Sequence, residues 1–132
     1  MPLAYSEEIA RRVRQALAHI VDLEEKKMIG GICFMVKGKM CTGVRGEEMM
    51  CRIGPDHFEE ALQERGCRPM TLNSRIMTGF VIIDKEGMQA KKDFDRWIKR
   101  SLDYNKFAKP AKGTKKERSL SLDKYQNNKK IK

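Results

Sequence analysis

Four cysteines and two histidines are the residues of this sequence whose types could bind a metal or act as nucleophile and base. The cysteines stand singly, and no two form a C-x-x-C pair: Cys33, Cys41, Cys51 and Cys67. Structural zinc sites usually show such short paired spacings, so we expect no metal and no cofactor. We expect reduced thiols packed on strands as small apolar groups. A catalytic cysteine would need His19 or His57 beside it in the fold, which the spacing leaves open.

Two further groups could support chemistry, and each also has a purely structural interpretation. Gly30-Gly31 interrupts a strand-like run, but no G-x-G-x-x-G or lysine-serine signature and no helix follows it. We therefore expect a bulge or a close backbone crossing rather than a phosphate loop. Glu59 and Glu60 resemble an acid–base pair, yet neighbours on a helix do not face each other. We predict that no residue is catalytic and that the protein is not an enzyme.

Basic residues near the glycine-rich strands form the candidate partner surface. They are Lys27, Lys37, Lys39, Arg52 and Arg75. A deep pocket that collects several of them would favour the alternative of a small-ligand binder or an unrecognised enzyme. A filled core with these side chains directed outward would favour a module that acts by contact with a protein partner, whose identity the sequence leaves unknown.

Positive charge is concentrated at the end of the chain. The net charge is +10, and residues 106–132 carry ten basic and two acidic residues, which leaves +2 on the remainder. We expect a disordered basic tail over 109–132, with weak, sequence-independent nucleic-acid binding as its candidate role. The candidate contacts are Lys109, Lys112, Lys115, Lys116, Arg118, Lys124, Lys129, Lys130 and Lys132.

A basic stripe also lies upstream of the tail. It contains Lys92, Arg96, Lys99 and Arg100, interleaved with Asp93, Asp95 and Asp103. A phosphate-contacting helix face is one interpretation. Because the aspartates dilute the positive field, we favour a solvated face.

Length and composition indicate one soluble domain. The chain has 132 residues, of which 40% are hydrophobic and 35% charged. No apolar run approaches the roughly 20 residues of a membrane span, and the first residues lack the pattern of a signal peptide. We therefore expect a cytoplasmic protein without membrane contact, divided into a domain over 1–108 and the tail over 109–132.

Hydrophobic periodicity and turn residues predict an α+β fold with a basic tail. The expected order is a helix over 6–21, a three-stranded antiparallel meander within 26–54, a short helix over 55–66, strands near 68–71 and over 75–83, and a helix over 88–107. Pro69 should keep its strand at a sheet edge.

Several side-chain placements follow from the same periodicity. Glu7–Arg11 and Glu8–Arg12 have the spacing of helical ion pairs. Trp97 is expected to anchor the core. In the strand over 75–83, strict alternation would place Met77, Val81 and Ile83 on one face, opposite Phe80 and Ile82.

At EEKKMIGGICFMVKGKMCTGV the chain resembles the N-terminal domain of the TfoX/Sxy bacterial competence regulators. The resemblance continues through MMCRIGPDHFEEAL, RPM, RIMTGFVII and FDRWIKRSLDY and covers roughly residues 7–109. It implies the same order of helices and strands and a regulatory role without known catalytic residues. Full-length members of that family help switch on DNA-uptake genes and carry a second, helical domain, where this chain has only the tail. The chain also departs from the family pattern at Ile29 and Ser74.

Overall fold

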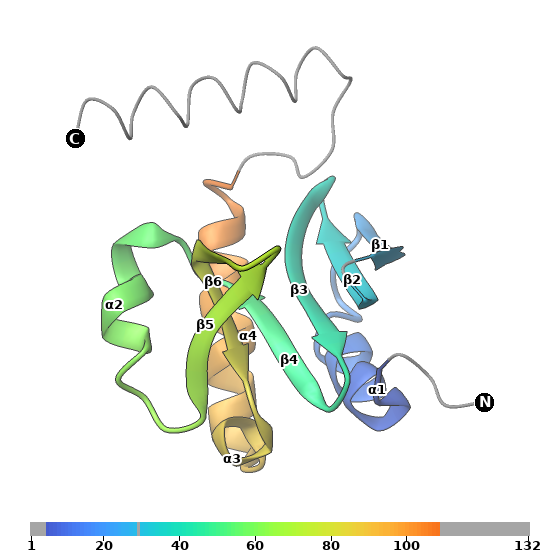
Figure 1. Ribbon diagram of the computed structural model, residues 1–132. Coiled ribbons are helices and arrows are strands. Elements are labelled where there is room, and N and C mark those ends of the chain that lie inside the picture. Colours follow the sequence, from blue (N-terminus) through green and yellow to red (C-terminus); the bar gives the residue numbers. More distant parts are fainter. Residues whose placement is uncertain (1–4, 29, 109–132) are drawn as a thin grey trace.

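The computed structural model describes residues 5–28 and 30–108 and confirms the α+β class (Figure 1). Along the chain it runs α1 (Glu7–Ala16), β1 (Leu23–Met28), β2 (Gly31–Val36), β3 (Lys39–Arg45), β4 (Glu48–Arg52), a 3₁₀ turn η1 (Pro55–His57), α2 (Phe58–Ala61), β5 (Cys67–Leu72), β6 (Arg75–Ile83), α3 (Lys85–Met88) and α4 (Lys91–Asn105). None of the helices in these ranges is long and apolar enough to cross a membrane.

One antiparallel sheet holds all six strands in the order β1-β2-β3-β4-β6-β5. The meander contains one strand more than expected, because the turn at Gly30 separates β1 from β2. Charged residues fill most of β1 and weaken its strand signal, which is why sequence analysis did not separate it. The expected close crossing is present at Gly31, where any side chain would collide with the carbonyl of Val44 on β3. At the other edge β5 contains Pro69, as predicted.

The helix α1 begins as predicted and ends five residues early. The Ser6 hydroxyl accepts a hydrogen bond from the amide of Ile9 at 3.2 Å and caps the helix. After Ala16 the chain tightens into a turn that places Leu17 in the core, fully buried. The two predicted i,i+4 ion pairs are wrong for the described residues: Glu7 pairs with Arg14 instead of Arg11, and Arg14 also binds Glu25 on β1.

Two predicted helices are each divided in the structure. The segment expected as a helix over 55–66 forms the turn η1 and the short α2. The last helix is preceded by α3, which Asp84 caps by accepting a hydrogen bond from the amide of Gly87 at 3.1 Å. Ala90 adopts an extended backbone, so the chain leaves the helical conformation after α3 and α4 begins separately at Lys91. Periodicity alone could not locate these breaks, since apolar positions continue across them.

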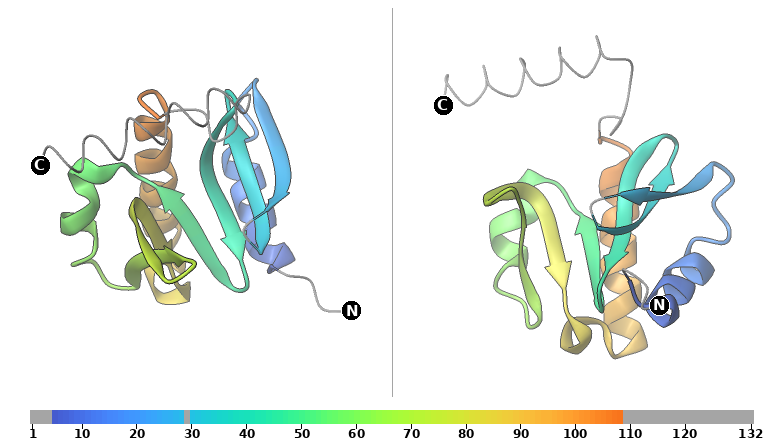
Figure 2. Two further views of the ribbon diagram at one scale, coloured as in Figure 1. Left: turned by 45° about the horizontal axis from the view of Figure 1, so that its top comes forward. Right: turned by 45° about the vertical axis from the view of Figure 1, so that its right-hand side comes forward.

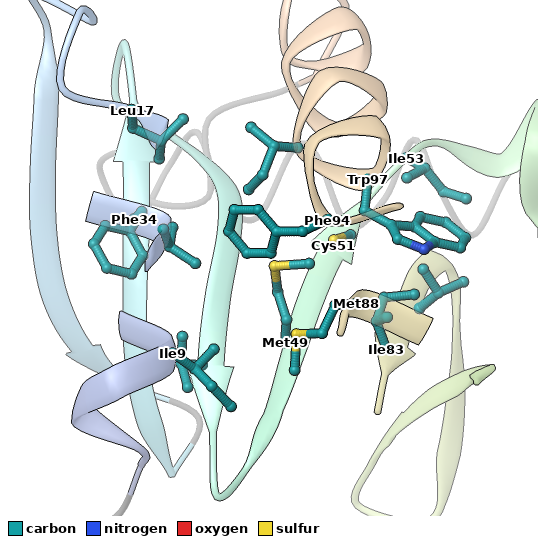
Figure 3. Close-up of a cluster of buried hydrophobic side chains, with 14 of the residues drawn as sticks. Ile9, Leu17, Phe34, Met49, Cys51, Ile53, Ile83, Met88, Phe94 and Trp97 are labelled. Atoms are coloured by element: carbon teal, nitrogen blue, oxygen red, sulfur yellow. The ribbon is translucent and has the colours of Figure 1, made fainter. Parts of the chain in front are cut away.

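The main core lies between the sheet and the helices α1 and α4 (Figure 3). Trp97 is 1% exposed and anchors it from α4, as predicted, while Phe34 enters from β2. Phe94 and Cys51 lie between them in the close-up. Both further views place α1 and α4 together on one side of the sheet (Figure 2). We call this side the helix-covered face.

A second cluster of apolar side chains lies on the opposite side of the sheet, which we call the methionine face. Its buried members are Cys33, Met35, Met40, Met50, Met70 and Ile82, and Met28, Met77 and Phe80 pack against them. Among the described residues no helix crosses this face (Figure 1). The strand pairing shifts register between Phe34 and Met35 and between Pro69 and Thr71, as β-bulges do.

The predicted alternation in β6 is wrong at one residue. Met77 lies on the methionine face with Phe80, whereas Val81 and Ile83 lie in the main core. Between them, Gly79 has φ of +94°, a conformation outside regular strand geometry. The alternation therefore shifts at this residue, which no pattern of period two could reveal.

Candidate functional site

A groove of about 830 Å³ separates η1 and α2 from α4 and is the strongest candidate for a contact site. Its walls combine apolar, aromatic and charged side chains. They are Ile53, Gly54, Asp56, His57, Glu60, Glu64, Arg96, Arg100, Asp103, Tyr104 and Phe107. Phe107 is 77% exposed, one of few large apolar side chains of the described residues that point to solvent.

Glu64 forms ion pairs with both arginines of the groove. Its two carboxylate oxygens accept hydrogen bonds from Arg96 Nη1 at 2.7 Å and from Arg100 Nη1 at 2.6 Å. Partial burial acts to raise the pKa of Glu64, but the two guanidinium groups outweigh it and hold that pKa below its usual value. The carboxylate is therefore ionised at neutral pH and ties the α2–β5 connection to α4.

The two arginines also cover the only tryptophan. Arg100 lies 4.4 Å and Arg96 5.5 Å from the centre of the Trp97 ring, a geometry that supports cation–π attraction. Elsewhere on α4, Lys99 pairs with Asp103 at 2.9 Å. Three of the four residues of the basic stripe, Arg96, Lys99 and Arg100, are thus paired with carboxylates. The sequence favoured a solvated face diluted by aspartates and did not indicate Glu64 as the partner of the two arginines.

Tyr104, near the carboxy-terminal end of α4, lines the groove. Its ring packs directly on Gly54, where any side chain would collide with it, and Gly54 has φ of +91°. Arg52 lies 5.8 Å from the Tyr104 ring centre and 5.1 Å from that of Phe80. Burial lowers the pKa of Arg52 below its usual value. Arg52 therefore acts mainly as a packed cation between two rings.

The five residues of the predicted partner surface are not gathered into one site. Lys39 is half-buried and donates from Nζ to the carbonyl of Asn105 at 2.9 Å, which ties β3 to the end of α4. Lys27 lies exposed on β1, and Arg75 lies exposed at the start of β6, near the opposite edge of the sheet. Lys37 lies exposed in the β2–β3 turn. None of the five lines the groove.

The predicted nucleic-acid contacts, from Lys109 to Lys132, lie outside the described residues. The structure therefore does not test them.

A second groove, of about 890 Å³, runs between α1 and the α3–α4 segment. Arg12 lies within it and stacks 4.2 Å from the centre of the Phe94 ring. Glu47 and Lys85 form an ion pair on its rim. Apart from Arg12 its charged residues are exposed and of both signs, and no aromatic side chain among the described exposed residues projects from it, so it is the weaker candidate.

The cysteines have the surroundings of packing residues. Burial raises the pKa of Cys41 to about 12 and that of Cys51 to about 11, so both are thiols at neutral pH. No histidine of the described ranges contributes to the pKa of Cys41, Cys51 or Cys67. No group of three or more histidine, cysteine, aspartate or glutamate residues there could hold a metal ion.

The groove has no signature in the sequence, because its two walls are 30 or more residues apart in the chain. The spacing of Arg96 and Arg100, one helical turn apart, was the only local signal, and it does not indicate which carboxylate lies between them.

The fold defines a class: an α+β protein in which one antiparallel sheet is backed by an amino-terminal and a carboxy-terminal helix. The family model of the TfoX N-terminal domain matches residues 15–104, and the chain belongs to that family. Neither a comparison with curated proteins nor one with solved structures returned a match. The matched range includes both walls of the α2–α4 groove except Phe107.

Proposed function

We propose that this protein is a non-enzymatic regulatory or adaptor module that acts by contact with a protein partner, in the control of DNA-uptake genes. Membership of the TfoX N-terminal domain family supports the regulatory role. The proposed setting is the cytoplasm, where regulation of transcription takes place in bacteria.

The observation that carries the contact role is the α2–α4 groove with Phe107 at its end. Exposed aromatic residues beside arginines are typical of protein interfaces, where they supply much of the binding energy. Phe107 is 77% exposed, and Arg96 and Asp103 provide charges of both signs within the same groove. Because Glu64 already binds both arginines, the rim is preorganised before any partner arrives.

A pull-down from the source cell with the full chain, with and without nuclease, tests this role. Phe107→Ser should reduce recovery of a specific partner at least tenfold, by loss of one well-packed anchor. Ile76→Ser is the matched control, since Ile76 is also a large exposed apolar residue, at 59%, but lies on β6 away from the groove. Equal recovery by both variants would refute the groove as the contact site.

The alternative is a small-ligand binder or an unrecognised enzyme. The volume of the groove, about 830 Å³, lies in the range of small-molecule sites. Its two arginines, however, are already paired with Glu64, and the five basic residues that would favour a ligand pocket lie elsewhere. A thermal-shift screen of anionic metabolites distinguishes the two: a stabilising ligand whose effect Tyr104→Ala removes would favour the alternative.

For the tail we propose weak binding to nucleic acid through Lys109 to Lys132. Phosphate affinity follows local cationic charge through counterion release, and most of the net charge lies there. Titration of labelled duplex should give a dissociation constant of about 10⁻⁴–10⁻⁶ M with a steep salt dependence. Removal of residues 109–132 should abolish it, and Lys92→Glu with Lys99→Glu should change it little. The opposite result would place binding on α4.

A further inference from the structure

The two edges of the sheet differ in how they are protected from other strands. At the β5 edge, Pro69 removes one backbone donor, and a bulge between Pro69 and Thr71 distorts the strand. Arg68 of β5 is also held by Glu48. At the β1 edge all six residues, Leu23 to Met28, pair with β2 without a bulge, and none is proline. Among the described strands, β1 therefore offers the only regular open edge.

The direction of the free backbone groups on β1 follows from its pairing with β2. Lys37 donates its amide hydrogen to the carbonyl of Asp22 at 2.9 Å, just before β1 begins. Bonded positions alternate along an antiparallel pair, so Glu24, Lys26 and Met28 bond to β2. The N–H and C=O groups of the intervening residues, Leu23, Glu25 and Lys27, therefore face away from the sheet.

The side chains of β1 carry charges of both signs in an order that suits a second copy of the same strand. Two copies related by a twofold axis through Glu25 would pair antiparallel, with Glu24 of one chain opposite Lys26 of the other. That contact occurs twice. The same register places Leu23 opposite Lys27 of the second copy and joins the outward backbone groups by about six hydrogen bonds.

The one like-charged pair in this register is already compensated. Glu25 would lie opposite Glu25 of the second copy, on the helix-covered face. Each Glu25 is held by its own Arg14, with Nε–Oε2 at 2.6 Å and Nη2–Oε1 at 3.0 Å. This bidentate pair cancels the carboxylate charge at the axis. The Glu24–Lys26 contacts lie on the methionine face, so the two sets of charges do not compete.

From these observations we propose that the β1 edge binds a second copy of this chain and extends the sheet across a twofold axis at Glu25. The joined sheet would contain the six strands of each copy, with both helix layers on the same side. Val21, which is 100% exposed just before β1, would lie beside the end of the neighbouring strand. The contact is small, so the dimer is weak, with a dissociation constant of roughly 10⁻⁵–10⁻³ M. It does not depend on the function proposed for the groove.

Charge reversal in the full chain tests the register by sedimentation equilibrium over a concentration series. Glu24→Lys and Lys26→Glu should each weaken self-association roughly tenfold, because each turns both attractive pairs into repulsive ones. An equimolar mixture of the two variants should associate again, since every lysine then meets a glutamate. The double variant, which has the composition of the original chain, should also associate. Thr71→Lys on the β5 edge is the control and should change nothing.

Amide hydrogen exchange gives a second, independent readout on the unaltered chain. As concentration rises, the amides of Leu23, Glu25 and Lys27 should become protected, while those of Glu24, Lys26 and Met28 are protected throughout by β2. Circular dichroism melts confirm that each variant remains folded. A chain that stays monomeric up to about 1 mM, or a dimer that neither single reversal weakens, overturns the proposal.

Discussion

The two faces of the sheet are both buried, but they are filled with different kinds of side chain. The helix-covered face combines branched and aromatic residues, such as Val13, Phe34 and Trp97, with helices that close over them. On the methionine face several strands contribute unbranched side chains, including Met35 and Met50, without a covering helix in the described residues. Methionine has three rotatable bonds and fills irregular space, whereas branched and aromatic groups require a matching shape. The difference indicates one face built for rigidity and one for adaptability.

Buried polar groups reinforce the contrast. On the helix-covered side the amide of Asn105 donates to the carbonyl of Val36 at 3.2 Å, and Ser101 donates to the carbonyl of Trp97 at 3.0 Å. Such bonds have one geometry and would be costly to leave unmade. The Asn105 bond therefore fixes α4 against β2, and the Ser101 bond satisfies a buried hydroxyl within the helix itself. The buried members of the methionine face have only apolar and sulfur-containing side chains, which tolerate small shifts.

The largest effect should come from removing the core anchor. Trp97→Ala should lower the free energy of unfolding by about 3–5 kcal/mol, and Met35→Ala by about 2–3 kcal/mol, since long neighbouring methionines can move into the space. Urea unfolding followed by circular dichroism measures both, as the Trp97 variant lacks tryptophan fluorescence. An equal loss for the two variants would contradict a difference between the faces.

Neighbouring methionines on β4 allow a matched comparison. Met49 points into the main core and Met50 into the methionine face, and both are at most 1% exposed. Met49→Leu should cost about 1–1.5 kcal/mol, because a branched side chain must fit among rigid neighbours, and Met50→Leu less than about 0.5 kcal/mol. Urea midpoints at one buffer condition compare them directly; the reverse order would show that the main core is the more adaptable.

Glu64, in the groove between α2 and α4, should make a smaller and pH-dependent contribution to the free energy of unfolding. Glu64→Gln should cost about 1 kcal/mol or less at pH 7, given its partial exposure. The folded pKa of Glu64 lies below its ordinary value, so its contribution is complete above the ordinary pKa and disappears as the pH falls through the folded one. The difference in melting temperature between the variant and the original chain should therefore shrink as the pH is lowered from 7 to 2. A gap that stays constant with pH would show that loss of the carboxylate charge is not the cause of the destabilisation.

Metal removal should have no effect on either face. The thiols of Cys41 and Cys51 stay protonated at neutral pH, with pKa values of about 12 and about 11, and the methionine sulfurs are occupied in packing. Purified protein should contain no stoichiometric zinc, and a chelator should leave its melting temperature unchanged. One zinc per chain by elemental analysis, with unfolding on chelation, would contradict this prediction.

The sequence by itself determined the class of the fold and most of the elements. Alternating apolar residues with turn glycines predicted β2, β3 and β4, Pro69 predicted an edge strand, and Ser6 predicted the start of α1. These features depend on neighbours within a few residues, where backbone preference and side-chain periodicity act directly. The family resemblance rests on the same kind of local pattern, and the match over 15–104 bears it out.

Only the tertiary structure decided which residues from distant segments contact one another. Arg14 reaches beyond its own helix to Glu25 on β1, and Glu64 lies between two arginines more than 30 positions away. The shift in β6 at Gly79 and the early end of α1 follow from packing against other strands and helices. A local pattern cannot encode these choices, because long-range packing selects among conformations that local preferences leave nearly equal in free energy.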